Sequence, residues 1–350
     1  MYNSAYPIID ENMTDGNVGC RKERSARDNI FVMGAVTNSI INGKCKPIQA
    51  QVMDIKTCFD KLWLEAALNA LYENGLQNDM LNLLFIENKT TNIAIKVNNI
   101  LSKRTNVTNV IMQGSVWGGL KCTSQMDILN KICNENENLQ YRYKSDPNIT
   151  IGVRGMVDDT LALAECGNPS ILKNTTVNSF VETKRLQMHR DKSVVLHVGN
   201  VEKCKRTCPQ LKVHEDIMPE KVSTKYLGNI ISANGGVSET VEDRRSKGWG
   251  KVAALLGVLG EVDMGSHRVE IGLLMRKAIL VSSLLWSAEA WSDIKERDLK
   301  RLEQVDSAYL KSLVKGHSKN PKNFHHLETG KIKIRHNKQI DLPQTHSDKR

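Results

Sequence analysis

The stretch ITIGVRGMVDDTLALAEC places two adjacent carboxylates, Asp158 and Asp159, between two runs of strand-forming residues. This pattern restricts the possible folds most strongly, because charged side chains seldom interrupt a buried hairpin without a compensating partner. Two interpretations are open. Aspartate is common in turns, so the pair can be a solvated turn, or it can be half of a metal site. Taken alone, the turn is the simpler interpretation.

A third carboxylate follows another predicted strand. The segment IQAQVMDI (48–55) is short, apolar and β-branched, which is typical of a buried strand, and Asp54 lies near its end. Alone, Asp54 could be a helix N-cap. If the two strands are neighbours, three carboxylates gather at one end of a sheet, and protonation or a bound cation must relieve their repulsion. Mg²⁺ takes such oxygen ligands, and two ions can bind the attacking 3′-hydroxyl and the leaving pyrophosphate in nucleotidyl transfer.

The rest of the pattern predicts mixed strands and helices up to about residue 237 and helices alone beyond it. The Asn98–Asn99 pair predicts a hairpin in TNIAIKVNNILSKRT. Asn168 is the expected N-cap of a helix, with Pro169 as its first residue. Residues 1–25 are polar and lack periodicity, so the pattern does not indicate which regular element, if any, they form. Further helices are expected in ARDNIFVMGAVTNSII, CFDKLWLEAALNALYENG (ending at Gly75), NDMLNLLFIEN and the segment after QGSVWGG.

The charge of the chain is unevenly distributed. The formal net charge is +10, and the segment from Lys295 to Arg350 has 14 basic and 7 acidic residues. A basic end of this kind is consistent with a polyanionic partner such as nucleic acid, and equally with a solvated basic helix and a polar tail.

The cysteines and apolar runs bear on location. None of the eight cysteines forms a C-x-x-C pair, which favours a reduced, intracellular chain. Cys204, Cys208 and His214 have no convincing fourth ligand for zinc. No signal peptide is visible, and the longest apolar run, AILVSSLLW, is too short to cross a bilayer, so we expect no membrane partner.

Six blocks of the chain, taken in order, resemble the reverse transcriptase of a LINE-type (non-long-terminal-repeat) retrotransposon. A double aspartate alone is weak evidence, and the order and spacing of the blocks carry the resemblance. The blocks are RKERSARDNIF (21–31), MDIKTCFDKLW (53–63), VIMQGSVWGGLKCT (110–123), GMVDDTLAL (155–163), KRLQMHRDKSVVLHVG (184–199) and KYLGNIIS (225–232). The resemblance implies an α+β fold: a polymerase right-hand palm, with an antiparallel sheet and packed helices, plus an all-helical thumb.

The resemblance also implies a domain order. Residues 1–45 would be a remnant of the fingers with a lead-in helix, 46–236 the palm with partial fingers, 237–318 the helical thumb, and 319–350 a basic polar tail. Met156 stands where the family usually has an aromatic residue. The basic fingers strands of full-length relatives have no counterpart upstream of residue 21, so the resemblance points to a truncated copy of such an element.

Carried over position by position, the resemblance assigns Asp54 and Asp158 as the main ligands of two Mg²⁺ ions, with Mn²⁺ as a possible substitute. Asp159 is auxiliary, and the main-chain carbonyl of Ile55 completes one metal shell. Phe59 would exclude a 2′-hydroxyl and so select dNTPs, although helix core is its other interpretation. The remaining assignments are Gln113 and Gly114 at the dNTP and template, Lys192 beside the pyrophosphate, and Tyr226, Leu227 and Gly228 as the primer grip. Taken singly, these last residues are an ordinary loop, a surface lysine and a hairpin turn.

The implied function is that of an RNA-directed DNA polymerase, which transfers a nucleotide to a primer 3′-hydroxyl. Its partners would be an RNA template, a DNA primer and dNTPs, and the sequence does not indicate an oligomeric state. Two alternatives stay open: an inactive remnant that only binds RNA or DNA, and an RNA-dependent RNA polymerase. The bulky Phe59 argues against the second.

Overall fold

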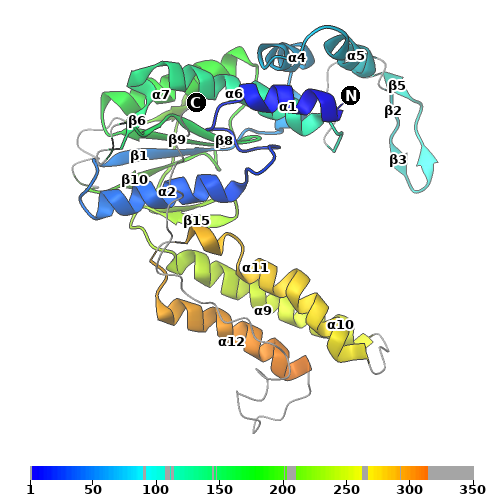
Figure 1. Cartoon of the computed structure of the whole chain (residues 1–350), viewed down its shortest axis with the longest axis vertical. Helices are drawn as coiled ribbons and strands as arrows, with labels where there is room; N and C mark the ends of the chain where they lie inside the picture. The colour runs from blue at the N-terminus through cyan, green and yellow to red at the C-terminus, as the bar shows by residue number, and fades with distance from the viewer. Residues whose placement is uncertain are drawn as a thin grey trace, which may run out of the picture. The chain divides into compact units, whose positions relative to one another are not determined.

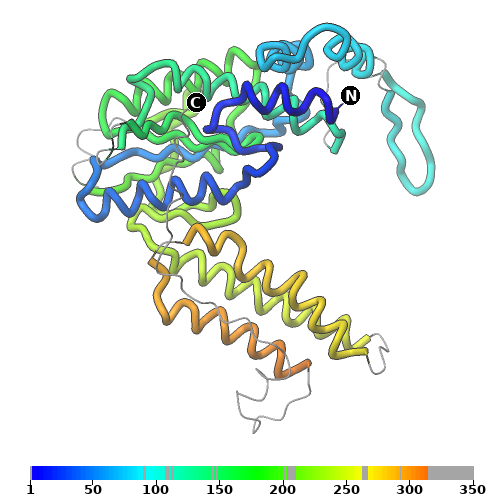
Figure 2. Tube along the Cα trace, viewed as in Figure 1, coloured from blue at the N-terminus to red at the C-terminus, as the bar shows by residue number. Residues whose placement is uncertain are grey.

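Figures 1 and 2 show the computed structural model of the chain, which describes residues 2–89, 92–106, 111, 114–143, 146, 148–200, 202, 210–261, 267–291 and 293–313. The chain divides into two compact units. The first comprises Met1–Thr240 and Ser287–Lys295, and the second comprises Val241–Trp286 and the segment that begins at Glu296. The predicted boundary after residue 236 lies close to this division, whereas no sequence pattern predicts that 287–295 belong with the first unit.

A five-stranded sheet forms the centre of the first unit. The strand order is β13-β10-β1-β9-β8, with β1 Ile48–Met53, β8 Val153–Met156, β9 Asp159–Glu165, β10 Val194–Val198 and β13 Glu220–Lys221. β1 is antiparallel to both β9 and β10, β8 and β9 form a hairpin, and only β13 runs parallel to its neighbour. All six residues of β1 are buried, as expected for a central strand with both faces covered.

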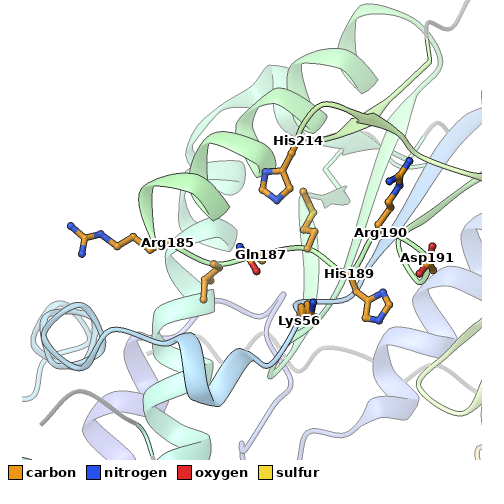
Figure 3. Close-up of a pocket in the computed structure, with 9 residues that line it drawn as sticks. Lys56, Arg185, Gln187, His189, Arg190, Asp191 and His214 are labelled. Atoms are coloured by element: carbon orange, nitrogen blue, oxygen red, sulfur yellow. The ribbon is translucent and has the colours of Figure 1, made fainter. Parts of the chain in front are cut away.

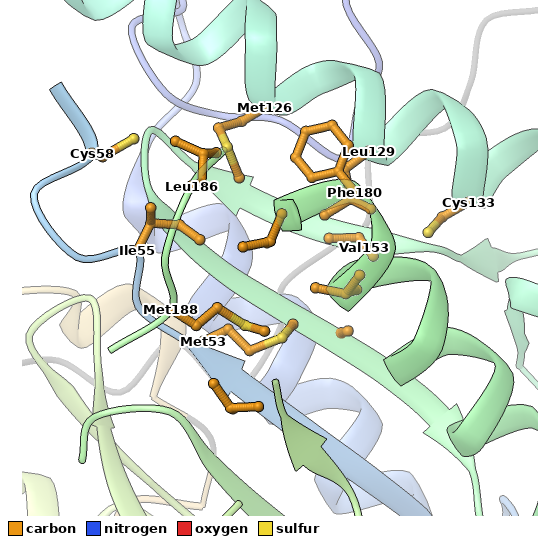
Figure 4. Close-up of a cluster of buried hydrophobic side chains, with 14 of the residues drawn as sticks. Met53, Ile55, Cys58, Met126, Leu129, Cys133, Val153, Phe180, Leu186 and Met188 are labelled. Carbon is orange, nitrogen blue, oxygen red and sulfur yellow. The ribbon is translucent and has the colours of Figure 1, made fainter. Parts of the chain in front are cut away.

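Alternate residues of β1 pack into two different cores, because successive side chains of a strand point to opposite faces. Ile48, Ala50 and Val52 pack with α2 (Ala26–Ile41), whose Met33, Val36 and Ile40 supply an apolar stripe. On the other face, Met53 joins a cluster under α6 (Gly118–Glu135) and α7 (Asn168–Thr183). Figure 4 shows this second cluster, which also includes Met126 and Leu129 of α6 and Phe180 of α7, with Met53 drawn beside Met188.

Smaller elements surround the sheet. They are α3 Cys58–Lys61, α4 Leu64–Glu73, α5 Asn78–Lys89, η1 Glu137–Leu139, η4 Ala288–Ala290, and the strand pairs β2–β5 (Asn92–Ile93 with Thr105–Asn106), β3–β4 (Lys96–Val97 with Ile100–Leu101), β6–β7 (Tyr141–Arg142 with Thr150–Ile151), β11–β12 (Lys212–Val213 with Asp216–Ile217) and β14–β15 (Ser223–Tyr226 with Asn229–Ser232). The expected helices that begin at Ala26 and Asn78 are present. The single helix expected over CFDKLWLEAALNALYENG is divided into α3 and α4, because Leu62 and Trp63 are extended, and Gly75 follows the end of α4 with φ +88°, as a helix stop requires.

One helix had no sequence signal and one local prediction was wrong. Residues 1–25 lack periodicity, yet Tyr2–Asn12 form α1, which buries Ala5 and Ile9 against an apolar cluster that includes Leu71 of α4 and Trp117. Burial of Ala5 and Ile9 against this cluster is enough to hold the helix in place. Two buried positions are too few to give a periodic signal in the sequence. The cap of α7 is Gly167 rather than Asn168, so Pro169 lies one position further into the first turn.

The second unit is helical throughout its described residues, as predicted. It contains most of α9 (Ser238–Glu261), α10 Arg268–Met275, the π-helical turn η3 Arg276–Val281, α11 Ser282–Leu284 and α12 Glu296–Leu313. Arg276 makes a buried two-point ion pair with Asp306 at 2.6 and 2.7 Å, and the Tyr309 hydroxyl donates to the Gly272 carbonyl. These contacts join the α10–η3 rod to α12.

One apolar run is longer than the sequence prediction allowed. Among the described residues, Arg268–Ala290 is the single helical run that is long and apolar enough to cross a membrane by length and composition alone. A packed helix of a globular unit passes the same test, and Gly272 and Arg276 of this run contact α12 as described above.

The cysteines are not all reduced as expected. Cys20, Cys45, Cys58, Cys122 and Cys133 are free, whereas Cys166 is disulfide-bonded. Cys204 and Cys208, which were weighed as zinc ligands with His214, lie outside the described residues. His214 itself lies 3.6 Å from a carboxylate oxygen of Glu182.

Candidate active site

Three predicted carboxylates lie at one end of two neighbouring strands. Met53 of β1 pairs with Thr160 of β9, so the next residue along, Asp54, faces Asp159. Asp158 lies in the turn between β8 and β9, where Met156 pairs with Asp159. The antiparallel pairing of β1 with β9 therefore brings Asp54 next to the Asp158–Asp159 pair, which is distant from it in the sequence.

The carboxylates lie within one another's electric field. Burial raises the pKa of Asp159 to about 6, and the negative charges of Asp158 and Asp54 add to this shift while Lys192 opposes it. Burial also raises the pKa of Asp158, with Asp54 adding to the shift. Lys192 Nζ lies 3.4 Å from Asp54 Oδ2 and so offsets part of the repulsion. The site is short of positive charge, which is what a cation-binding cluster requires.

The donor set suits a hard divalent cation but is not gathered into a complete ligand shell. Carboxylate oxygens are the ligands that Mg²⁺ prefers, and it takes only one or two of them beside water and phosphate. Across the described parts of the chain, no three His, Cys, Asp or Glu side chains are arranged to hold one metal ion. Ile55 has no donor atom in its side chain, which is buried in the core, so only its main-chain carbonyl could serve as a ligand. The predicted Mg²⁺ ions therefore stay a prediction.

A groove of about 630 Å³ joins the carboxylates to the β14–β15 hairpin. Predicted residues from three parts of the sequence line it, namely Asp54, Asp159, Lys192, Leu227 and Gly228. Leu227 and Gly228 form the hairpin turn, with φ of +46° and +83°. Two of the expected metal ligands, the expected pyrophosphate lysine and two of the three expected primer-grip residues thus line one groove, whereas Asp158, the other main expected ligand, is not among its lining residues.

Tyr226, the remaining predicted grip residue, supports this surface from behind. Its side chain is buried, and its hydroxyl accepts a hydrogen bond from Asn29 Nδ2 at 3.4 Å. Burial raises the pKa of the Tyr226 phenol, and the negative charge of Asp159 adds to the shift. Tyr226 therefore acts through packing and position rather than by lining the groove.

Phe59 and the Gln113–Gly114 block are not placed in the groove. Phe59 is half-buried on the short helix α3 and packs against the core cluster, which is the alternative that its sequence context left open. Gly114 has φ +83°, and a Cβ at this position would meet nothing within 4 Å. Gln113 lies outside the described residues. The dNTP roles of these three residues stay predictions.

A second pocket, of about 490 Å³, adjoins the groove and shares Asp191 with it. Figure 3 shows its lining, which includes Lys56, Arg190 and His214 around the segment before β10. Arg190 is paired with Asp216 at 3.0 Å, and His214 lies near Glu182. Much of the positive charge here is compensated, so the pocket is a weaker candidate than the carboxylate groove.

The structure reveals a brace that the sequence pattern did not indicate. Residues 16–18 run beside β8: the Gly155 N–H donates to the Gly16 carbonyl at 2.9 Å, and the Val18 N–H donates to the Gly155 carbonyl at 3.0 Å. Asn17 Nδ2 donates to the Thr123 carbonyl of α6 at 2.9 Å. A Cβ on Gly19 would lie 2.5 Å from the main-chain nitrogen of Val157. The small residues of GNVG let this segment approach the Val157–Asp158 turn closely.

Asn29 is a second residue without a clear sequence signal. It is fully buried on α2, and its Nδ2 donates to the Gly155 carbonyl at 3.2 Å as well as to Tyr226. Its Oδ1 accepts a hydrogen bond from Arg154 Nε at 2.9 Å. One side chain therefore links the lead-in helix, the strand β8 that leads into the double aspartate, and the predicted primer-grip hairpin. A polar residue inside an otherwise apolar helix face was the only hint of this role.

A mainly antiparallel sheet flanked by helices, with acidic residues at the ends of its central strands, agrees with the palm of a nucleic-acid polymerase. The family model described as "Reverse transcriptase (RNA-dependent DNA polymerase)" matches residues 4–231. This match covers most of the chain, which therefore belongs to the reverse transcriptase family. A search of curated proteins found no match.

Solved telomerase structures are similar over most of this chain. Telomerase from Candida albicans, in complex with a fragment of telomeric RNA, is 14% identical, with a TM-score of 0.44, and the match covers 91% of this chain and 52% of that chain. Apo telomerase from Candida tropicalis is 12% identical, with a TM-score of 0.49, and the match covers 92% of this chain and 51% of that chain. The chain thus spans about half the length of these proteins. The assignment above rests on the family match.

Proposed function

We propose that the chain is an RNA-directed DNA polymerase that adds dNTPs to the 3′-hydroxyl of a DNA primer on an RNA template. The observation that carries this proposal is that Asp54 and Asp159 line one groove with Leu227 and Gly228 of the β14–β15 turn, while the charge of neighbouring Asp158 raises the pKa of Asp159. Membership of the reverse transcriptase family supports it.

In this proposal, Asp54 and Asp158 hold two Mg²⁺ ions, or Mn²⁺ in their place, with Asp159 beside them and the Ile55 carbonyl completing one shell. Bound ions of this kind stabilise the negative charge that develops on the attacking and leaving oxygens. Lys192 Nζ lies 3.4 Å from Asp54 Oδ2. During the reaction, the Lys192 ammonium can instead stabilise the negative charge of the departing pyrophosphate.

The other residues position the reactants. The Leu227–Gly228 turn supports the primer end, and buried Tyr226 holds that turn against α2 through Asn29. Phe59, Gln113 and Gly114 keep the dNTP and template roles that the resemblance implies. The bulky ring of Phe59 would exclude the 2′-hydroxyl of an rNTP by steric clash.

The particular kind of reverse transcriptase is also part of the proposal. The six ordered blocks favour a LINE-type retrotransposon enzyme, acting inside the cell on RNA template and DNA primer. The primer-extension assay below uses a primer and a template unrelated to any retrotransposon. Its result therefore tests the polymerase chemistry and not the LINE-type origin.

The testing experiment is primer extension on an RNA template with Mg²⁺ and dNTPs, comparing wild type with Asp158→Asn. The amide keeps the size of the side chain and removes its charge, so we expect extension to fall at least about a hundredfold. Asp15→Asn, at an exposed residue that forms an ion pair with Arg24, is the control and should extend normally. Equal extension by Asp158→Asn and wild type would refute the assignment.

A second candidate function is nucleic-acid binding without catalysis. It is favoured by the finding that no three described metal-ligand side chains are arranged around one ion. It predicts salt-sensitive binding to RNA or DNA and no incorporation above the Asp158→Asn background. Incorporation of rNTPs as efficient as that of dNTPs would instead favour an RNA polymerase.

A further inference from the structure

The hairpin arm, residues 92–106, is exposed along almost its whole length. It is made of β2 paired with β5 and β3 paired with β4, and it projects from the body next to α5 (Figure 1). Its turn residues Asn98 and Asn99 have φ of +47° and +66°, a conformation that asparagine tolerates well. A lone two-stranded ribbon is marginally stable in water, so this arm gains from a binding partner.

One face of the arm is an apolar stripe. Val97 pairs with Ile100 across the ribbon, and Ile95, two residues before Val97, points to the same side. Their side chains are 61%, 75% and 65% exposed. These aliphatic groups flank the tip rather than the base of the arm, so they are placed for insertion into a partner.

The arm is also basic and free of acidic residues. Lys96, Lys103 and Arg104 are all exposed on it. From residue 88 to residue 126 the sequence contains no Asp or Glu, although the whole chain has 39 of them. A local excess of positive charge without any carboxylate is complementary to a polyanion.

We propose that the hairpin arm binds a nucleic-acid duplex, with its cations on the phosphates and Val97 and Ile100 pressed against a base step. Aliphatic side chains inserted between base pairs unstack and bend duplexes. Single strands are instead bound by aromatic stacking platforms, and the arm has no aromatic residue. Lysine is depleted in protein–protein interfaces, which disfavours a protein partner. This activity goes beyond nucleotidyl transfer and does not require it.

The first test measures binding of the whole chain to a fluorescent DNA duplex over a range of salt concentrations. Each phosphate contact contributes about 0.9 to the slope of log affinity against log salt. Lys96→Gln/Lys103→Gln should therefore lower that slope by about 2. Lys22→Gln/Lys44→Gln, at exposed lysines elsewhere on the same unit, is the matched control and should leave the slope unchanged.

The second test concerns the apolar tip. We expect wild type to raise the fluorescence of 2-aminopurine placed in the duplex, because unstacking removes its quenching, and Val97→Ser/Ile100→Ser to abolish that rise without changing the salt slope. The same variant should extend a primer normally on an unstructured template and slowly on a template that is already paired ahead of the primer.

Three outcomes would overturn the proposal. They are an unchanged salt slope in the lysine variant, an unchanged 2-aminopurine signal in the tip variant, and a wild-type dimer that the tip variant converts to monomer, which would make a second copy the partner. Failure of the polymerase proposal looks different, because it would abolish incorporation in wild type and leave both binding measurements readable.

Discussion

Two hairpins of the first unit are held in place very differently. The β8–β9 hairpin, which carries the double aspartate, is a member of the central sheet and is held by residues 16–18 and by Asn29. The hairpin arm, residues 92–106, pairs only within itself among the described strands. The first hairpin presents charges at fixed positions for chemistry, whereas the second presents exposed apolar groups.

The turns of the two hairpins show the same contrast. Val157 adopts a left-handed φ of +59°, which is strained for a β-branched residue, whereas Asn98 and Asn99 adopt such values readily. Val157 stays in this conformation because it packs against the core cluster and lies beside Gly19. The packed surroundings of Val157 hold its strained backbone in place. The arm has no such packing, so its turn depends on residues that adopt a positive φ readily, such as Asn98 and Asn99.

The largest effect on stability is expected at the contact between the N-terminal brace and the β8–β9 turn. Gly19→Ala would place a Cβ 2.5 Å from the Val157 nitrogen, and main chain cannot move aside cheaply. We expect a loss of about 3 kcal/mol in the free energy of unfolding, measured by chemical denaturation. Gly250→Ala, whose Cβ would meet nothing within 4 Å inside α9, should be neutral or stabilising. An undiminished stability of Gly19→Ala would show that the brace is not close-packed.

A somewhat smaller loss is expected from Asn29→Ala. The change leaves the buried Arg154 guanidinium without its Oδ1 acceptor and removes a donor from the Gly155 carbonyl, so we expect about 2 kcal/mol of destabilisation. Asn29→Asp keeps the acceptor for Arg154 but loses both donated bonds. If Arg154 is the important partner, the Asp variant should be clearly more stable than the Ala variant in the same denaturation experiment, and equal losses would exclude this.

The charge cluster predicts opposite pH dependences for stability and activity. The pKa of Asp159 is about 6 in the folded chain against an ordinary value of 3.8, so the fold favours the protonated form. This stabilisation is complete below pH 4 and is lost as the pH rises through 6, and solvent screening reduces it to about 1 kcal/mol. Metal-dependent extension should instead rise with pH over this window as the carboxylate ionises.

Asp159→Asn provides the control for this prediction. The amide does not titrate, so the decrease in unfolding free energy between pH 4 and pH 6 should become smaller. A pH profile of stability identical to that of wild type would place the responsible carboxyl elsewhere.

The smallest effect is expected in the arm. Val97→Ser/Ile100→Ser removes apolar groups that are already exposed to water, so the free energy of unfolding should change by less than about 0.5 kcal/mol. Thermal unfolding in the absence of nucleic acid measures this directly. A large loss of stability would mean that the arm packs against the body, and the contrast between the two hairpins would fail.

Much of the fold could be predicted from local patterns. The apolar run 48–53, the Asn98–Asn99 turn and the helix from Ala26 each combine several agreeing signals, and the structure has them as predicted. Helix α1 was missed because its contacts come from α4 and Trp117 rather than from its own periodicity. The brace at residues 16–19 was missed for a similar reason, since glycine and asparagine signal a loop whether or not that loop touches a strand.

The sequence by itself determined which residues could carry the chemistry: a carboxylate after a buried strand, two more in a hairpin turn, and a lysine before a later strand. Apolar periodicity and turn-forming residues predicted the strands and the turn, and the ordered blocks of the family resemblance singled out the carboxylates and the lysine. Only the tertiary structure decided that Asp54 faces Asp159, that Lys192 lies 3.4 Å from Asp54, and that Asn29 ties the double-aspartate strand to Tyr226. Strand pairing and close packing join residues that are far apart along the chain, and a single sequence does not display those pairings.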